Sequence, residues 1–578
     1  MLAQNDINSP ADASSALFDK IPGWIDSATA SAQASLSDPT VMAFGTLCVA
    51  GLVTTTIGGP RVLRKAAIAA RTDPSDLYIG DRNGGKIFGQ LPVRLRWEDR
   101  CTGVRITGPP GSGKTTAAVL YAMDDLLAGR DVFIVESHGD LGTEVKKRAE
   151  ALGVDILTAD ASDAAAMYWN PLAGADTEDV ANRVSAAISS SLHYHGFYTP
   201  MGETIVRNFV HLARDYTERF LDKDPSQANW KLLYDLIWNA DFLHEVLQTK
   251  TEKDASGSKR MRVGNDWLSD GPRAWFNSEF FDLPSAERHR NMENIANLFD
   301  KLSKSRGAKH ILYPDPEREE LDLYGLLREP PACSNGSNGL GRLIMVRAPV
   351  QVMDESPART ITYLVLKIMR DATLARAAPE HHTRPLSMFV DELPAIIGQA
   401  EEETQREVTT WLALVRDKNV APHLIFQGHA LLPRVMRDGL DATVRNFIVF
   451  GGSSADEVEH IRRSAGVAEM DVEDSRTSYS SSGKTYSEGK RKAEKKRLSF
   501  DEVKYRPRGE AIFLGVRKSG DQLPLIVKTR RAKPVEHYQK LREKAEAKEE
   551  AARVRAEERA AKQAAEQAAK KRQTEMSR

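Results

Sequence analysis

The sequence predicts an α/β fold in which a nucleotide-binding core carries an inserted all-α domain and follows an N-terminal transmembrane helix. Three observations support this prediction. An apolar run at 104–107 leads into a glycine-rich turn and then into a helical pattern. A second apolar run ends in two acidic residues at 391–392. Between these features, residues 178–309 have mostly helical periodicity. An α/β core that is interrupted by helices is therefore expected.

The glycine-rich turn has the residues of a phosphate-binding loop. It comprises Gly108, Pro109, Pro110, Gly111, Ser112, Gly113, Lys114, Thr115 and Thr116. The glycines permit backbone angles at which amide groups converge on phosphate oxygens, at the positive end of the next helix. Lys114 is expected to reach the β- and γ-phosphates, and the hydroxyl of Thr115 to bind Mg²⁺. The sequence thus predicts a site for ATP and Mg²⁺; the alternative is a loop that only caps a helix.

The acidic pair supplies the second part of such a site. An apolar run at 386–390 precedes Asp391 and Glu392. Asp391 is expected to hold Mg²⁺ and Glu392 to polarise the attacking water.

Two later residues each have a functional and a purely structural interpretation. Gln427 ends the apolar run 423–426 and either senses the γ-phosphate or makes a strand-end hydrogen bond. Arg416 is either an arginine finger for a neighbouring subunit or a cation at a solvated helix end.

Length and composition limit the class of protein. The chain has 578 residues and a formal net charge of -1, so two or three domains are expected and the total charge identifies no partner. Cys48, Cys101 and Cys333 lie far apart, which excludes a disulfide framework or a cysteine metal site and predicts reduced thiols.

The N-terminal region predicts a membrane anchor. Residues 1–38 are polar and lack the basic start of a secretory signal. Residues 39–60 contain no charged side chain, and four basic residues follow by position 71. A transmembrane helix at 39–60 is expected, with the rest of the chain in the cytoplasm. The alternative is a buried or surface-lying helix.

The remaining segments complete the predicted organisation. The nucleotide-binding core is expected at 74–175 and 320–534, with the all-helical domain at 176–315. The tryptophans of the helical domain are expected to be core residues, and 252–262 an exposed loop.

Two charged segments have open interpretations. Residues 478–508 are rich in serine and basic residues, and either contact nucleic-acid phosphates or form a solvated loop. Residues 535–578 form either a charged helical or disordered tail or a docking site for a partner, since no apolar stripe lets them bury themselves.

These motifs together resemble the type IV coupling proteins, the inner-membrane ATPases of conjugation and type IV secretion. The resemblance covers about 75–530 and depends on 108–116, on the strand that leads to 136–140, on 169–172, 389–393 and 425–427, and on the late stretch 478–483. It implies a RecA-like P-loop ATPase core, a membrane anchor, and homo-hexamers with ATP at the subunit interfaces. It also assigns the ATP-site roles to Lys114, Thr115, Asp391, Glu392 and Gln427, and the finger to Arg416.

The sequence departs from the family pattern at three places. Residues 136–140 read Glu-Ser-His-Gly-Asp instead of the usual Asp-x-Lys-Gly-Glu. Val415 and Asn419 stand where a glycine commonly flanks the finger arginine, although asparagine tolerates a left-handed turn. One membrane helix is found where the family has two.

The functional hypothesis is an ATPase that couples single-stranded DNA, with its relaxase, to a type IV secretion channel at the bacterial inner membrane. Two alternatives stay open: a coupling ATPase that recruits protein effectors, and an ATP-gated receptor or scaffold without motor activity.

Overall fold

The computed structural model describes residues 76–83, 90–136, 140–174, 176–194, 200–253, 259–328, 339–377, 384–397, 402–480, 483–515 and 524–576. Within these ranges, no helix combines the length and the apolar character that a membrane crossing requires. The span predicted at 39–60 lies outside the described residues, as do Cys48 and Cys333. Cys101 is a buried free thiol.

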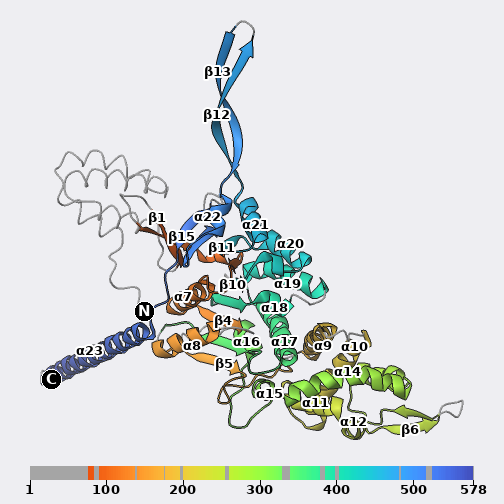
Figure 1. Ribbon diagram of the computed structural model, residues 1–578. Coiled ribbons are helices and arrows are strands. Elements are labelled where there is room, and N and C mark those ends of the chain that lie inside the picture. Colours follow the sequence, from red (N-terminus) through yellow and green to blue (C-terminus); the bar gives the residue numbers. More distant parts are fainter. Residues whose placement is uncertain are drawn as a thin grey trace.

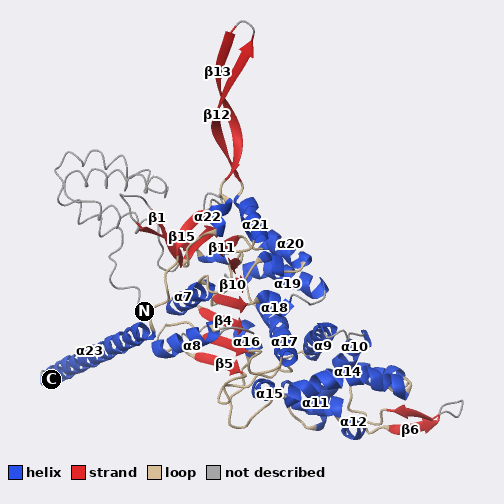
Figure 2. Ribbon diagram, viewed as in Figure 1, coloured by secondary structure: helices blue, strands red, loops and turns tan. Residues whose placement is uncertain are grey.

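Eleven strands form one mixed sheet at the centre of the molecule (Figures 1 and 2). Their order is β2-β1-β15-β14-β11-β3-β10-β9-β4-β8-β5. The seven strands from β11 to β5 are parallel, and the other four continue the sheet in antiparallel fashion. The bounds are β1 Leu77–Asn83, β2 Gln90–Leu95, β3 Val104–Thr107, β4 Asp131–Glu136, β5 Ile156–Asp160, β8 Leu343–Arg347, β9 Leu386–Asp391, β10 Val420–Phe426, β11 Asn446–Phe450, β14 Glu510–Leu514 and β15 Leu525–Lys528.

Helices cover both faces of the sheet, which explains why its parallel strands are apolar on consecutive residues. On one face, Val132 and Ile134 pack with α7 (Lys114–Leu127) and α8 (Leu141–Leu152). On the other face, Phe133 and Val135 belong to a core that includes α17 (Glu355–Leu374) and α19 (Glu402–Leu414). This arrangement fits the predicted RecA-like P-loop ATPase core.

The strand that follows α8, β5, begins only at Ile156. The reason is the end of α8, where Gly153 takes the left-handed conformation (φ 80°) and the N–H of Val154 bonds to the carbonyl of Ala149. This closing turn occupies Gly153 and Val154 and so keeps them out of the strand.

Between β5 and β8 the chain is mainly helical. The helices are α9 Thr177–Tyr194, α10 Pro200–Asp215, α11 Trp230–Trp238, α12 Ala240–Leu247, α13 Asp270–Trp275, α14 Ser285–Lys304, α15 Arg306–Leu312 and α16 Leu323–Arg328. Trp230 and Trp275 are buried as expected, whereas Trp238 is 49% exposed. The loop expected at 252–262 is in part a hairpin, in which β6 (Lys250–Lys253) pairs with β7 (Lys259–Arg262).

A long β-ribbon occupies most of the basic segment. β12 (Val467–Ser480) and β13 (Gly483–Lys496) pair along their full length, from Val467 with Lys496 to Ser480 with Gly483. The ribbon stands clear of the body in Figure 1. These residues therefore form a β-ribbon and not a loop. Because the ribbon lies away from the core, its sequence lacks the apolar alternation by which a strand is usually recognised.

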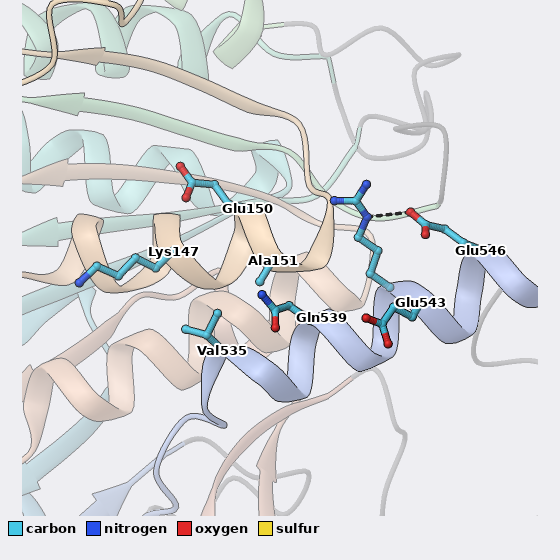
Figure 3. Close-up of a pocket in the computed structure, with 8 residues that line it drawn as sticks. Lys147, Glu150, Ala151, Val535, Gln539, Glu543 and Glu546 are labelled. Atoms are coloured by element: carbon cyan, nitrogen blue, oxygen red, sulfur yellow. Dashed lines mark hydrogen bonds and ion pairs between the residues drawn. The ribbon is translucent and has the colours of Figure 1, made fainter.

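The C-terminal segment is a single helix, α23 (Val535–Met576), and its first turns are docked on the core. Tyr538 is 2% exposed and belongs to the apolar cluster that includes α8. The view in Figure 3 shows the groove between α8 and α23. Its lining residues are Lys147, Glu150, Ala151, Val535, Gln539, Arg542, Glu543 and Glu546. The expectation that this segment cannot bury itself was wrong for these first turns, because one aromatic residue provides the anchor.

Candidate nucleotide site

The loop between β3 and α7 has a backbone that side chains would obstruct. Gly108, Gly111 and Gly113 have φ values of 151°, 75° and 118°. A Cβ atom at Gly108 would lie 2.8 Å from both the Cβ of Phe450 and the Oγ of Ser112. Gly113 is the residue before the first turn of α7, so the unpaired N–H groups of that helix face the loop. The loop therefore has the shape and the positive polarity that suit a phosphate group.

Lys114 folds back over this loop. Its Nζ donates hydrogen bonds to the carbonyl oxygens of Gly108 (2.5 Å) and Pro109 (3.1 Å), and the residue is 8% exposed. Burial lowers the pKa of Lys114, while the carboxylates of Glu392 and Asp391 act in the opposite direction. The ammonium group thus lies inside the loop and opposite two acids. Thr115 and Thr116 are exposed in the first turn of α7.

Three neighbouring parallel strands bring the second motif and Gln427 to the same edge of the sheet as the loop. In their register, Phe426 of β10 is opposite Thr107 of β3, and Ile425 is opposite Asp391 of β9. β10 lies between the other two strands. The segments that follow all three strands therefore emerge side by side. This places Asp391, Glu392 and Gln427 around the loop that starts at Gly108.

Glu392 and Gln427 contact each other directly. The Nε2 of Gln427 donates to Oε1 of Glu392 at 3.3 Å. Glu392 has a φ of 54°, a left-handed conformation that is uncommon for a residue with a long side chain. Backbone strain of this kind is concentrated at functional sites. The amide of Gln427 is exposed and so is accessible to a ligand.

Asp391 has an unusually high proton affinity. Its pKa is raised to about 7, first by burial and then by the charges of Glu136 and Glu392, while Lys114 lowers it. Three carboxylates close to one another destabilise the ionised form of each. A divalent cation relieves this repulsion, and carboxylate and hydroxyl oxygens are ligands that Mg²⁺ prefers. Asp391 and the hydroxyl of Thr115 are the residues that could hold Mg²⁺ here.

An ion-pair network that the sequence analysis missed fixes Glu136. Arg347, at the end of β8, donates from Nε to Oε2 of Glu136 (3.0 Å) and from Nη1 to Oδ2 of Asp160 (2.7 Å). The N–H of Gly142 reaches the same oxygen of Glu136 at 3.1 Å. Glu136 is therefore a buried acid in a fixed position. The only sequence signal for Arg347 is a basic residue at the end of an apolar run.

A second missed contact connects the loop strand to the residues after Gln427. The hydroxyl of Thr107 donates to Oε1 of Glu457 (2.9 Å), and the N–H of His429 donates to Oε2 (2.5 Å). Glu457, in α21 (Ala455–Ala465), is 2% exposed. One buried carboxylate thus joins the start of the phosphate-type loop to the segment after β10.

Arg416 does not belong to this group of side chains. It lies in the 3₁₀ turn Val415–Lys418, which precedes β10, whereas Gln427 follows that strand. The seven residues of β10 separate the two by roughly 20 Å. The Arg416 side chain is 59% exposed. Asn419 ends the turn in the left-handed conformation (φ 57°), as the sequence analysis anticipated.

Comparison with solved structures gives proteins of similar fold. No family model and no curated protein matches the chain. Among solved structures, the unbound bacterial conjugative coupling protein TrwB aligns with a TM-score of 0.53 and 16% identity, over 83% of this chain and 94% of that one. TrwB with the non-hydrolysable ATP analogue ADPNP aligns with a TM-score of 0.53 and 15% identity, over 83% and 95%.

The complex of TrwB with ADP and Mg²⁺ gives a TM-score of 0.52 and 15% identity, over 76% of this chain and 88% of that one. At these identities the similarity establishes a shared fold. The structural relatives are coupling proteins, in agreement with the family resemblance identified from the sequence motifs.

Proposed function

We propose that this protein is a Mg²⁺-dependent ATPase that couples a DNA–relaxase substrate to a type IV secretion channel. The observation that carries the proposal is the meeting of Lys114, Asp391 and the Glu392–Gln427 pair at adjoining strand ends. The coupling protein TrwB, which shares the fold, binds an ATP analogue and also ADP with Mg²⁺. TrwB is also known with the GTP analogue GDPNP, so these relatives support a purine nucleotide with Mg²⁺ as the ligand, and their description as coupling proteins supports a role in conjugation.

The proposed mechanism gives each residue one task. The amides of 108–116 and the ammonium of Lys114 hold the phosphates, with Lys114 exchanging its loop carbonyls for phosphate oxygens. Thr115 and Asp391 would hold Mg²⁺, which would neutralise charge on the phosphates. Glu392 orients the attacking water, and Gln427, bonded to Glu392, detects the γ-phosphate.

Arg416 has a task in this mechanism only if a second copy supplies it. It is exposed and lies at the opposite sheet edge from its own loop. A homo-hexamer, in which each copy presents this edge to the loop of the next, would place the guanidinium at the phosphates. The hexamer and a membrane anchor at 39–60 in the bacterial inner membrane, with the bulk of the chain in the cytoplasm, are parts of the proposal.

The cellular test is transport by the Lys114→Ala variant. We expect loss of DNA transfer at normal protein levels, because the phosphates lose their main counter-charge. Lys147→Ala, which alters a 56% exposed lysine of α8, is the matched control and should transfer normally. Normal transfer by Lys114→Ala would rule out the motor role.

A protein cargo is the second candidate, and exposed apolar side chains of the helical region favour it. Phe220 and Trp238 are 53% and 49% exposed. Exposed apolar side chains of this kind are typical of surfaces that bind another protein. Loss of effector secretion without loss of DNA transfer in Trp238→Ala would favour effectors. An ATP-gated receptor, in contrast, predicts that Glu392→Gln transports normally while it still binds ATP.

A further inference from the structure

Beside the candidate nucleotide site, on the sheet face opposite α7, lies a cluster of two histidines and one aspartate. His429 follows β10, Asp441 belongs to α20 (Arg434–Thr443), and His460 belongs to α21. The cluster adjoins Arg105 of β3, whose side chain points away from α7. None of these side chains has a task in the proposed hydrolysis, so the cluster needs its own explanation.

The spacing of the three side chains is that of metal ligands. One oxygen of Asp441, Oδ1, lies 3.2 Å from Nε2 of His429 and 3.5 Å from Nε2 of His460. Ligating atoms in a tetrahedral zinc site, with bonds of about 2.0–2.1 Å, are about 3.3–3.4 Å apart. All three ligand atoms fall within 4.8 Å of one another. The three ligand atoms are therefore close enough to share one ion once the two imidazole rings reorient.

The second observation is a buried nitrogen without a hydrogen bond. Among the described residues, Nε2 of His460 has no hydrogen-bond partner, although it is shielded from solvent. An imidazole nitrogen is a common metal ligand, and this one has no competing hydrogen bond among the described residues. A buried nitrogen without a hydrogen-bond partner is a position at which a water molecule or an ion can bind.

Neighbouring side chains hold the carboxylate of Asp441 in a fixed orientation, as is usual for a metal ligand. Nη2 of Arg105 donates to Oδ1 of Asp441 at 2.8 Å, and the guanidinium lies 4.3 Å over the ring of Phe447. Ligating carboxylates are commonly oriented by such hydrogen bonds. The charges that face the cluster are Asp441, Arg105, Glu457 and Arg463. The two positive groups disfavour a cation, whereas the two acids favour it.

We propose that His429, Asp441 and His460 bind a divalent transition-metal ion of the Zn²⁺ type, with water as the fourth ligand. Asp441 is 38% exposed, which gives the ion a route from solvent. The two imidazole rings are stacked, with centroids 3.9 Å apart and planes at 11°. Binding must splay these rings, because their in-plane lone pairs have to converge on one ion.

Occupancy would join three separate elements. The ion would connect α20 and α21 to the segment after β10, two residues beyond Gln427. This site is independent of the proposed function, since its ligands are not those of Mg²⁺ and its spectroscopic detection requires no ATP hydrolysis.

The test is a Co²⁺ titration of the purified full-length chain without nucleotide. We expect the visible absorption of four-coordinate Co²⁺, with one equivalent bound and displaced by Zn²⁺. His460→Gln should abolish this absorption, and the variant loses no hydrogen bond of Nε2. His289→Gln, at an exposed histidine of α14, should retain it. Asp391→Asn should also retain it.

Three outcomes would overturn the proposal. One is the absence of four-coordinate absorption in the wild-type chain. Another is its persistence in His460→Gln and in His429→Gln. The third is its loss in Asp391→Asn, which would place the ion in the nucleotide site. Displacement by Zn²⁺ in the wild-type chain provides evidence that does not depend on the folding of any variant.

Discussion

The hydroxyl of Thr107 donates a 2.9 Å hydrogen bond to the buried carboxylate of Glu457. Thr107 is the last residue of β3, directly before the phosphate-type loop. The other carboxylate oxygen accepts from the backbone of His429, two residues after Gln427. The two sides of the candidate site are therefore joined through a single side chain.

Thr107→Val tests this connection. The change preserves the shape but leaves Oε1 of Glu457 buried without its donor, so we expect a loss of about 1–3 kcal/mol in the free energy of unfolding. Denaturant unfolding measures it. In Thr443→Val, only a hydrogen bond within helix α20 is removed, and the loss should be smaller. Equal losses in the two variants would contradict the connecting role of Glu457.

The pH dependence of Mg²⁺ binding follows from the raised pKa of Asp391, about 7. Below this pH the carboxyl keeps its proton, and the proton competes with the cation. The apparent affinity for Mg²⁺–nucleotide should therefore fall about ten-fold per pH unit below 7 and be nearly constant above it. A fluorescent nucleotide titrated with Mg²⁺ from pH 5.5 to 8.5 measures this.

Two variants control the pH experiment. Glu136→Gln removes the neighbouring charge that most raises the pKa of Asp391, so the midpoint should move to lower pH. Asp391→Asn should show only the pH dependence of the nucleotide itself. A wild-type affinity that is constant from pH 5.5 to 8.5 would contradict the role of Asp391.

Arg416 can assist hydrolysis only in a neighbouring copy. Arg416→Ala should lower the rate of ATP hydrolysis by about 10³-fold or more. Mixing Arg416→Ala with Lys114→Ala should restore activity, because some interfaces then combine an intact loop with an intact arginine. Arg406→Ala, at another exposed arginine, is the control. A fully active Arg416→Ala would mean that this residue is a solvated cation at the helix end.

Tyr538 anchors α23 to the core, where it is 2% exposed. Tyr538→Ala should destabilise the chain by about 3 kcal/mol, through lost apolar contact and the cavity left behind. Thermal unfolding of the full-length protein measures the change. Tyr505→Ala is the matched control, since that tyrosine is 70% exposed. If both variants unfolded at the same temperature, α23 would not be held by this contact.

The parallel strands of the sheet could be predicted because both of their faces are buried. Runs such as 132–135 are apolar at every position, and a glycine-rich loop or an acidic pair follows two of these strands. The β12–β13 ribbon could not be predicted in this way, because it stands away from the core and its stretch of sequence is charged. β15 was also missed, since it is short and lies among the antiparallel strands.

Residues of the candidate site could be predicted where they belong to a short sequence motif. Lys114 is adjacent to the glycines, and Asp391 and Glu392 end an apolar run. Arg347 and Glu457 were missed, because their partners Glu136 and Thr107 are 211 and 350 positions away in the sequence. Only the order and register of the strands bring such residues together.

The central claim, that this site hydrolyses ATP to drive DNA transport, is tested most directly by ATP turnover. The measurement compares the full-length protein with and without single-stranded DNA, beside its Glu392→Gln variant. We expect turnover that rises with DNA and is lost in the variant, because Glu392 orients the attacking water. DNA-independent turnover, or equal turnover in Glu392→Gln, would contradict the account.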